Sequence, residues 1–112
     1  HIFYSKYRII NIEKLKNKRI TAFAGIGNPT NFFDLLRENN INLVKTYSFP
    51  DHHNYSKKDF IKIFGDKSSK VITTEKDYFR MTSDQKENCD YVSVNLEIEN
   101  KDKLRDLIKI HI

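Results

Sequence analysis

The sequence predicts a small α/β domain, on the evidence of three observations. Short β-rich segments alternate with segments of helical periodicity, which is the order typical of parallel sheets with helices on their faces. Three of the β-rich segments run directly into short polar loops. The composition, 38% hydrophobic and 31% charged over 112 residues, is that of an ordinary globular domain. We therefore expect a three-layer Rossmann-like domain with a mostly parallel sheet of about four strands.

The first half of the chain gives three of the expected elements. Residues 2–10 are aromatic and β-branched, and predict an amino-terminal strand that pairs outside the main sheet. Residues 19–24 form a short apolar run typical of a buried parallel strand. A helix is predicted from Pro29 to Asn39, since four apolar residues recur there at helical spacing. These are Phe32, Phe33, Leu35 and Leu36.

The second half continues the alternation. A second strand is predicted over residues 41–49, and a helix begins at Ser56, where a hydroxyl stands three positions before Asp59. Phe60, Ile61 and Phe64 give that helix an apolar face, and Gly65 is its expected C-cap. The remaining expected elements are a third strand over 71–74, a short helix that carries Tyr78, Phe79 and Met81, a polar loop over 83–89, a fourth strand over 91–96 and a final helix over 101–110.

Charge and cysteine content exclude some classes of protein. The net charge is +5, but 15 acidic residues stand among 20 basic ones without a basic tract, so nucleic acid is not an expected partner. The single cysteine, Cys89, cannot form an internal disulfide, which indicates a reducing compartment. No apolar run approaches the roughly 20 residues of a membrane span. Since the chain begins at His1 with strand-like residues, we expect it to be part of a longer protein.

The three polar loops should gather at one edge of the sheet, where the carboxyl ends of parallel strands lie and ligands usually bind. The first is the glycine loop, residues 25–29. Gly25 and Gly27 permit close approach to an anion at a helix amino terminus. The glycine loop is not a dinucleotide-binding fingerprint, because that motif needs a third glycine at position 30, which is Thr. No Walker A sequence is present either. Ligand contact and a tight turn against a neighbouring loop or domain remain equally open.

The histidine loop, residues 49–55, is the second, and its Asp51, His52 and His53 favour acid–base chemistry. The alternative is a surface turn whose imidazoles cap backbone groups. A metal site is disfavoured, because neighbours in sequence rarely point at one ion. The acidic loop, residues 73–77, is the third. Its Lys76 can contact phosphate or lock the loops through ion pairs, or the loop can simply begin a helix.

Together, the three loops resemble one known family. Its motifs are Phe-Ala-Gly-Ile-Gly-Asn-Pro at 23–29 followed by a Phe-Phe pair, Phe-Pro-Asp-His-His-Asn-Tyr at 49–55 and Thr-Thr-Glu-Lys-Asp at 73–77. In order and spacing they are similar to the carboxy-terminal half of the tetraacyldisaccharide 4'-kinase (lipid A 4'-kinase) family. The resemblance runs across nearly the whole chain.

This resemblance implies a two-domain kinase whose amino-terminal P-loop domain binds most of the ATP and Mg²⁺. The family phosphorylates the 4'-hydroxyl of the lipid A disaccharide precursor, giving lipid IVA at the cytoplasmic face of the inner membrane of Gram-negative bacteria. Residues 1–18 would be the inter-domain linker strand and connection, and 19–112 the carboxy-terminal domain. Its implied partners are the lipid precursor, its own P-loop domain and the membrane surface.

The resemblance also implies roles for individual residues. His52, with His53 as the second candidate, would support the catalytic acid in deprotonating the sugar hydroxyl, and Asp51 would orient the loop or approach the metal and phosphates. The residues expected to contact the nucleotide are Gly25, Gly27, Asn28, Lys76 and Asp77.

Because the Walker A lysine is absent, this chain alone is expected to be inactive. As a fragment it is also expected to be soluble. Two other functions stay open. One is a stand-alone module that binds a phosphorylated ligand or a partner at the same loops. The other is a metal-dependent hydrolase built on Asp51, His52 and His53.

Overall fold

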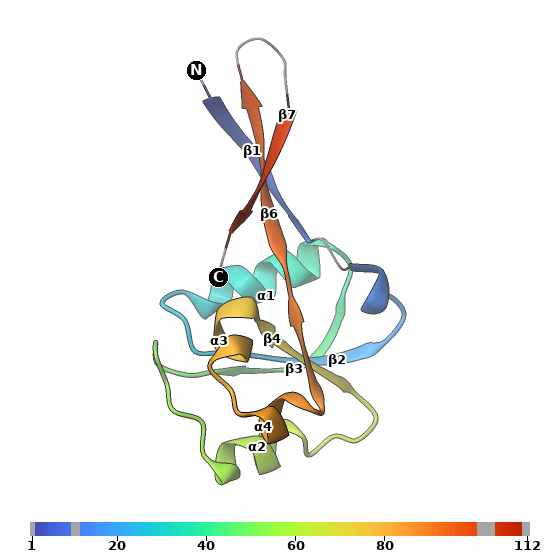
Figure 1. The fold of residues 1–112 in the computed structure, drawn as a ribbon. Coiled ribbons are helices and arrows are strands. Elements are labelled where there is room, and N and C mark those ends of the chain that lie inside the picture. Colours follow the sequence, from blue (N-terminus) through green and yellow to red (C-terminus); the bar gives the residue numbers. More distant parts are fainter. Residues whose placement is uncertain (1, 10–11, 101–104, 111–112) are drawn as a thin grey trace.

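The computed structural model describes residues 2–9, 12–100 and 105–110, with side chains over 12–94. A parallel sheet with helices on both faces forms the body, and a three-stranded antiparallel sheet projects from it (Figure 1). The projection makes the molecule elongated, with extents of 51 × 30 × 23 Å. No helix in these described ranges is long and apolar enough to cross a membrane.

The parallel sheet contains β2 (Arg19–Ala24), β3 (Asn42–Ser48), β4 (Lys70–Thr74) and β5 (Cys89–Val92). Its strand order is β3-β2-β4-β5, and every neighbouring pair is parallel. The two central strands are almost wholly buried, whereas β3 at the edge is only half-buried. This architecture confirms the predicted Rossmann-like α/β fold.

Two helices cover opposite faces of this sheet (Figure 1). Successive residues of a strand point to opposite faces, so β2 sends Ile20 and Ala22 toward one cluster and Phe23 toward the other. Helix α1 (Pro29–Glu38) packs its buried side chains on the first face, and α2 (Lys57–Ile63) packs on the second. Those of α1 are Phe32, Phe33 and Leu36, and Ile63 and Phe60 are the main contributors from α2.

The shorter helices complete the body. They are the 3₁₀ turn η1 (Ile12–Lys14), α3 (Glu75–Phe79) and α4 (Ser83–Lys86). Helix α4 lies within the predicted polar loop 83–89, so that prediction was wrong in part: Thr82 and Gln85 form a capping box that starts a helical turn. At the end of α2 the C-cap is Phe64, one residue before the expected Gly65.

The projecting sheet has the order β1-β6-β7 with antiparallel pairing. It consists of β1 (Ile2–Ile9), β6 (Val94–Asn100) and β7 (Arg105–Ile110). Strand β1 pairs outside the parallel sheet, as its sequence predicts. Strand β6 follows β5 after the single residue Ser93, so the chain passes directly from one sheet into the other (Figure 1).

The sequence-based prediction was wrong at the carboxyl end. We expected a helix over residues 101–110, but β7 occupies 105–110; residues 101–104 lie outside the described part of the chain. Leu107 and Ile108 fit helical spacing, yet Ile108 and Ile110 also alternate as a strand requires, and pairing with β6 decides between the two. The single strand expected over 91–96 is likewise two strands, β5 and β6, which separate at Ser93.

Cys89 is also placed differently from the prediction. We expected it in the polar loop, but it begins β5 and is buried in the core beneath α2. Burial raises the pKa of the Cys89 thiol far above its ordinary value, because the thiolate would lose its hydration. The side chain therefore acts as a small apolar core residue.

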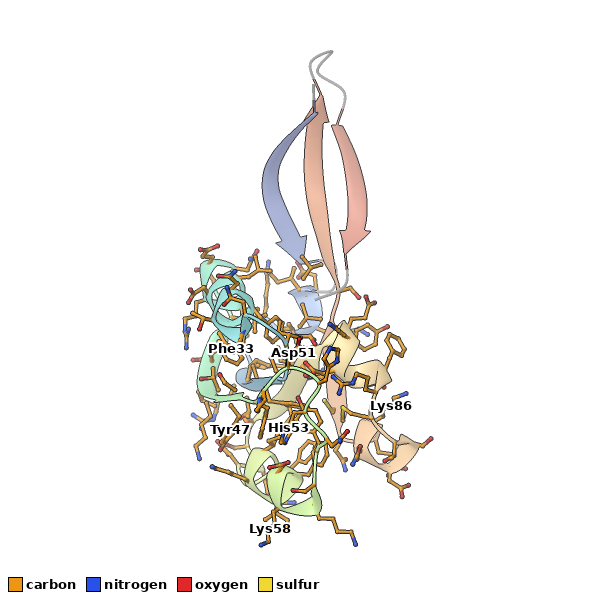
Figure 2. The ribbon with its side chains drawn as sticks, turned by 90° about the vertical axis from the view of Figure 1, so that its left-hand side faces the viewer. Phe33, Tyr47, Asp51, His53, Lys58 and Lys86 are labelled. Carbon is orange, nitrogen blue, oxygen red and sulfur yellow. The ribbon has the colours of Figure 1, made fainter. Side chains whose placement is uncertain are left out.

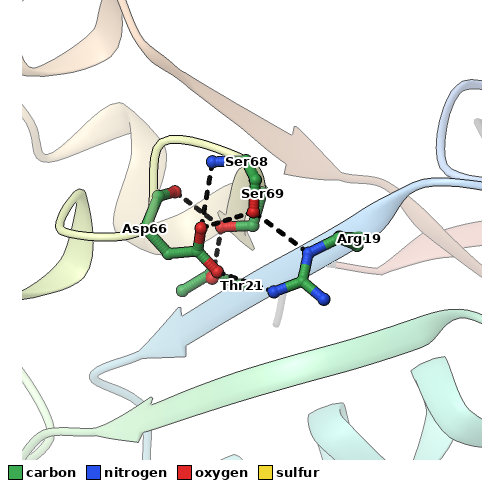
Figure 3. Close-up of polar contacts among 5 residues, drawn as sticks. All are labelled: Arg19, Thr21, Asp66, Ser68 and Ser69. Atoms are coloured by element: carbon green, nitrogen blue, oxygen red, sulfur yellow. Dashed lines mark hydrogen bonds and ion pairs between the residues drawn. The ribbon is translucent and has the colours of Figure 1, made fainter.

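A cluster of hydrogen-bonded polar side chains lies at the amino-terminal ends of β2 and β4 (Figure 3). Asp66, in the loop before β4, accepts hydrogen bonds from the Ser68 hydroxyl at 2.6 Å and the Arg19 guanidinium at 2.9 Å. The hydroxyls of Thr21 and Ser69 lie 2.7 Å apart beside them. The bond from Ser68, followed by that from Arg19, lowers the pKa of Asp66 to about 2. The cluster therefore ties the α2–β4 loop to the start of β2.

The Asp66 cluster should make stability depend on pH in a defined window. A lowered carboxyl pKa stabilises the fold fully above the unfolded value near pH 4, and this stabilisation is lost as pH falls toward 2. The difference in free energy of unfolding between the wild type and Asp66→Asn, measured by urea denaturation, should therefore shrink from pH 4 to pH 2. Ser68→Ala should move the NMR titration of the Asp66 carboxyl upward. A wild-type titration near pH 4 would contradict the cluster.

Candidate functional site

The three predicted loops do lie together, at the carboxyl ends of β2, β3 and β4. Figure 2 looks onto this edge, with Asp51 and His53 near the middle and Lys58 of α2 below them. The glycine loop and the histidine loop are joined by backbone bonds: Phe49 N–H donates to Ala24 O at 2.8 Å, and His52 N–H donates to Gly25 O at 3.2 Å. The gathering expected from parallel strand order is thus confirmed.

One carboxylate joins all three loops. Asp77, in the first turn of α3, is fully buried. Its Oδ2 accepts the backbone N–H of Gly25 at 3.0 Å and the hydroxyl of Thr74 at 2.6 Å, and its Oδ1 accepts the hydroxyl of Tyr55 at 3.1 Å. Thr74 in turn accepts the Asp77 N–H and caps α3, so the acidic loop does begin a helix, one of the two alternatives that the sequence left open. Asp77 therefore locks the loops through hydrogen bonds from neutral donors rather than through ion pairs.

The Tyr55 side chain packs against other aromatic rings. Its ring meets those of Phe23 and Phe49 edge-on, with centroids 5.2 Å and 5.1 Å away. Burial, together with the nearby charge of Asp77, raises the pKa of Tyr55 well above its ordinary value of 10.0. The hydroxyl therefore remains protonated and donates to Asp77 throughout the neutral range.

The two glycines of the glycine loop have different surroundings. A Cβ added at Gly25 would lie 2.8 Å from the Tyr55 hydroxyl and 3.2 Å from both Asp77 Oδ1 and Pro50 O. A Cβ added at Gly27 would meet no atom within 4 Å. Neither glycine has a positive φ. Packing therefore requires glycine at position 25, whereas at position 27 the described chain gives no such reason.

His52 is presented outward by an uncommon backbone conformation. Its φ is 60°, in the left-handed region that histidine seldom adopts. The side chain is 69% exposed, and its Nε2 lies 3.6 Å from Asp51 Oδ2. Asp51 and His52 thus form an open acid–imidazole pair at the edge of the sheet.

His53 is instead part of the scaffold. Its ring stacks on Phe49 with centroids 4.7 Å apart, and its Nε2 lies 2.9 Å from Asp59 Oδ2. Asp59 also accepts the Ser56 N–H in the predicted capping box of α2. The Ser56 bond, followed by the His53 bond, lowers the pKa of Asp59. His53 therefore couples the histidine loop to α2.

The other predicted site residues fall around these loops. Asn28 is the N-cap of α1 and accepts the Asn31 N–H at 3.4 Å. Lys76 is exposed on α3, whereas Glu75 beside it is buried and accepts the Ser93 hydroxyl at 3.3 Å. Within the described side chains, no group of three or more histidines, cysteines and acids could hold a metal ion.

Sequence reasoning missed two contributors to this edge. Tyr55 was noted only as one aromatic of its loop, and its bond to Asp77 spans 22 residues of sequence. Arg80, the C-cap of α3, donates to His53 O at 3.3 Å and adds a positive charge beside the histidine loop. This contact spans 27 residues of sequence, and no local pattern indicates it.

Comparison with known proteins now identifies the family. The family model described as Tetraacyldisaccharide-1-P 4'-kinase matches residues 5–112. The chain belongs to this family. The Tetraacyldisaccharide 4'-kinase of Pelagibacter ubique is 37% identical over 111 residues, covering 95% of this chain and 35% of that protein. The Rickettsia akari protein of the same name is 37% identical over 101 residues, covering 88% of this chain and 30% of that protein.

A solved member of the family shares the fold. It is the "apo" form of LpxK from Aquifex aeolicus, crystallised in complex with ATP, and it superposes with a TM-score of 0.58 at 20% sequence identity. The match covers 92% of this chain and 32% of that chain. The present chain thus spans about a third of the length of the relatives it matches.

The two glycines should respond differently to the same substitution. Gly25→Ala should destabilise the chain by about 1–3 kcal/mol, the usual cost of an overpacked position, because Tyr55, Asp77 and Pro50 must move. Gly27→Ala is the matched control and should change stability by less than about 0.5 kcal/mol. Urea denaturation followed by circular dichroism measures both. Equal losses in the two variants would contradict the packing described here.

Proposed function

We propose that this chain is the carboxy-terminal domain of a kinase that transfers the γ-phosphate of ATP to the 4'-hydroxyl of tetraacyldisaccharide 1-phosphate, yielding lipid IVA. Membership of the family and the names of its relatives support the reaction. The observation that carries the assignment of a site is the outward-facing His52, 3.6 Å from Asp51 at the edge where three loops meet.

The proposed reaction divides between two domains. Phosphoryl transfer depends on positioning the phosphates and neutralising their charge, which a Walker A loop and bound Mg²⁺ accomplish. This sequence has no Gly-Lys-Ser/Thr segment, and a single exposed carboxylate such as Asp51 does not make an octahedral Mg²⁺ site. We therefore assign the phosphates and Mg²⁺ mainly to an amino-terminal P-loop domain, and expect this chain alone to be inactive.

Within this chain, His52 is the proposed acid–base residue. An imidazole changes charge near neutral pH, so it can accept the proton of the sugar hydroxyl or support a carboxylate that does so. Asp51 would hold the imidazole in its orientation. His53 is the weaker candidate, because its Nε2 and its ring already contact Asp59 and Phe49.

The glycine loop and α3 would face the nucleotide. Gly27 is exposed and has free space where a side chain would stand, Asn28 caps α1 beside it, and Lys76 is an exposed cation at the same edge. Gly25 would support this surface from within. Asp77 is buried and already accepts three hydrogen bonds, which favours a supporting role over direct contact with ATP.

The proposed cellular location of the reaction follows from the lipid nature of its acceptor. Because the lipid A disaccharide precursor carries acyl chains, the full-length kinase would work at the cytoplasmic face of the inner membrane. Its partners there would be the lipid precursor, the membrane surface and its own P-loop domain.

A phosphorylation assay with ATP and the lipid disaccharide tests this proposal. The full-length protein containing this chain should phosphorylate the acceptor. His52→Ala should lower kcat by about 10²- to 10⁴-fold, the range for loss of a general acid or base, with little change in melting temperature. His53→Ala is the matched control, which should lower the melting temperature more than His52→Ala does, because it loses the Asp59 bond.

The other outcomes are equally informative. A loss of only a few-fold in His52→Ala would remove His52 from the chemistry. Activity of this chain alone would overturn the division between two domains. Absence of activity in the full-length protein would reject the kinase and favour a module that binds a phosphorylated ligand or partner at the same loops.

A further inference from the structure

The backbone of His52 must be held in place by its surroundings. A non-glycine residue with a φ of 60° is strained, and such a conformation persists only where neighbouring contacts fix it. The side chain of His52 is mostly exposed, so its own packing cannot supply this restraint. The restraint must come from the residues before and after it in the chain and from the loops they touch.

The histidine loop has a turn bond of its own, from His53 N–H to Pro50 O at 3.1 Å. Among its bonds to the other loops, two connections lead to Asp77, one through the His52 amide and one beyond it. His52 N–H donates to Gly25 O at 3.2 Å, and Tyr55, three residues on, donates its hydroxyl to Asp77 Oδ1 at 3.1 Å. Gly25 is itself fixed, because its N–H donates to Asp77 Oδ2 at 3.0 Å. Both connections therefore end on the same carboxylate, one on each of its oxygens.

Asp77 is a rigid support for these connections. It is fully buried, it stands in the first turn of α3 directly after the central strand β4, and the Thr74 hydroxyl bonds to its Oδ2 at 2.6 Å. Its own N–H bonds to Thr74, so backbone and side chain are both fixed. Reactive groups are held most accurately when the residues behind them are locked by packing and hydrogen bonds of this kind.

We propose that Asp77 and Tyr55 are positioning residues for the phosphoryl transfer: they touch none of the reacting atoms, and together they hold the His52 backbone in the conformation that presents its imidazole. This inference rests on the proposed function. A direct nucleotide contact by Asp77 is the alternative, and its complete burial beneath Gly25 and Tyr55 argues against it.

Tyr55→Phe is the sharpest variant for testing this role. It removes one hydrogen bond and keeps the ring that packs edge-on against Phe23 and Phe49. Asp77 retains its bonds from Gly25 and Thr74, so the fold should survive. Tyr47→Phe is the matched control, because it also removes one hydroxyl bond, to Lys62 O at 3.4 Å, but belongs to the edge strand β3 outside the three loops.

The experiment is a double-mutant cycle in the full-length kinase, with the wild type, Tyr55→Phe, His52→Ala and the double variant. Tyr55→Phe should lower kcat about 10-fold, since small displacements of a reacting group have large effects, and leave KM for ATP and acceptor within about 2-fold. In the His52→Ala background it should have no further effect, because it acts through His52. Tyr47→Phe should leave kcat unchanged. Hydrogen exchange of the His52 amide should accelerate in Tyr55→Phe but not in Tyr47→Phe.

The outcomes separate this inference from the proposed function. An inactive wild type would reject the kinase function and this inference with it. An active wild type with an unchanged kcat in Tyr55→Phe would reject the inference alone. An equal loss of kcat with and without His52 would also overturn it, because Tyr55 would then act on the fold or on the nucleotide rather than through His52.

Discussion

The hydrogen bonds of the buried Asp77 carboxylate are the constraint on which this edge of the molecule depends. A carboxylate removed from water is strongly unfavourable unless donors replace its hydration, and here Gly25, Thr74 and Tyr55 do so. Those donors come from all three loops. The loops must therefore close for Asp77 to be satisfied, and Asp77 must be in place for the loops to keep their shape. The geometry of the site and the stability of the fold are coupled through one side chain.

The parallel sheet makes such coupling possible. Strands β2 and β4 lie side by side at the centre, so the loops that follow them meet without long connections. Their opposite ends are tied by the Asp66 cluster (Figure 3), and the Thr73 hydroxyl bonds to Phe23 O between them. Both ends of the two central strands are thus fixed. Small loops attached to a rigid pair of strands can hold an exposed side chain accurately.

Local signals explain what the sequence could predict. The apolar run of β2, the proline at the start of α1 and the capping box at Ser56 each act within a few residues, and each was interpreted correctly. The strand β7 was missed because its identity depends on pairing with β6, and Ile108 suits both a helix and a strand. The bond from Tyr55 to Asp77 was missed because it joins side chains of two loops that lie far apart in the sequence. The positive φ of His52 was missed because the residue usually associated with that conformation is glycine, and position 52 is a histidine.

The backbone conformation at His52 also explains how two adjacent histidines come to differ. In an extended or helical segment, the regular backbone repeat would fix the directions of both imidazole rings. The left-handed residue reverses the chain locally, so His52 faces solvent beside Asp51 while His53 turns inward onto Phe49 and Asp59. The strain at His52 is thus offset by the contacts of its neighbour and by the loops bound to Asp77. A site of this kind is specified less by the identity of the histidine than by the buried contacts that determine where it points.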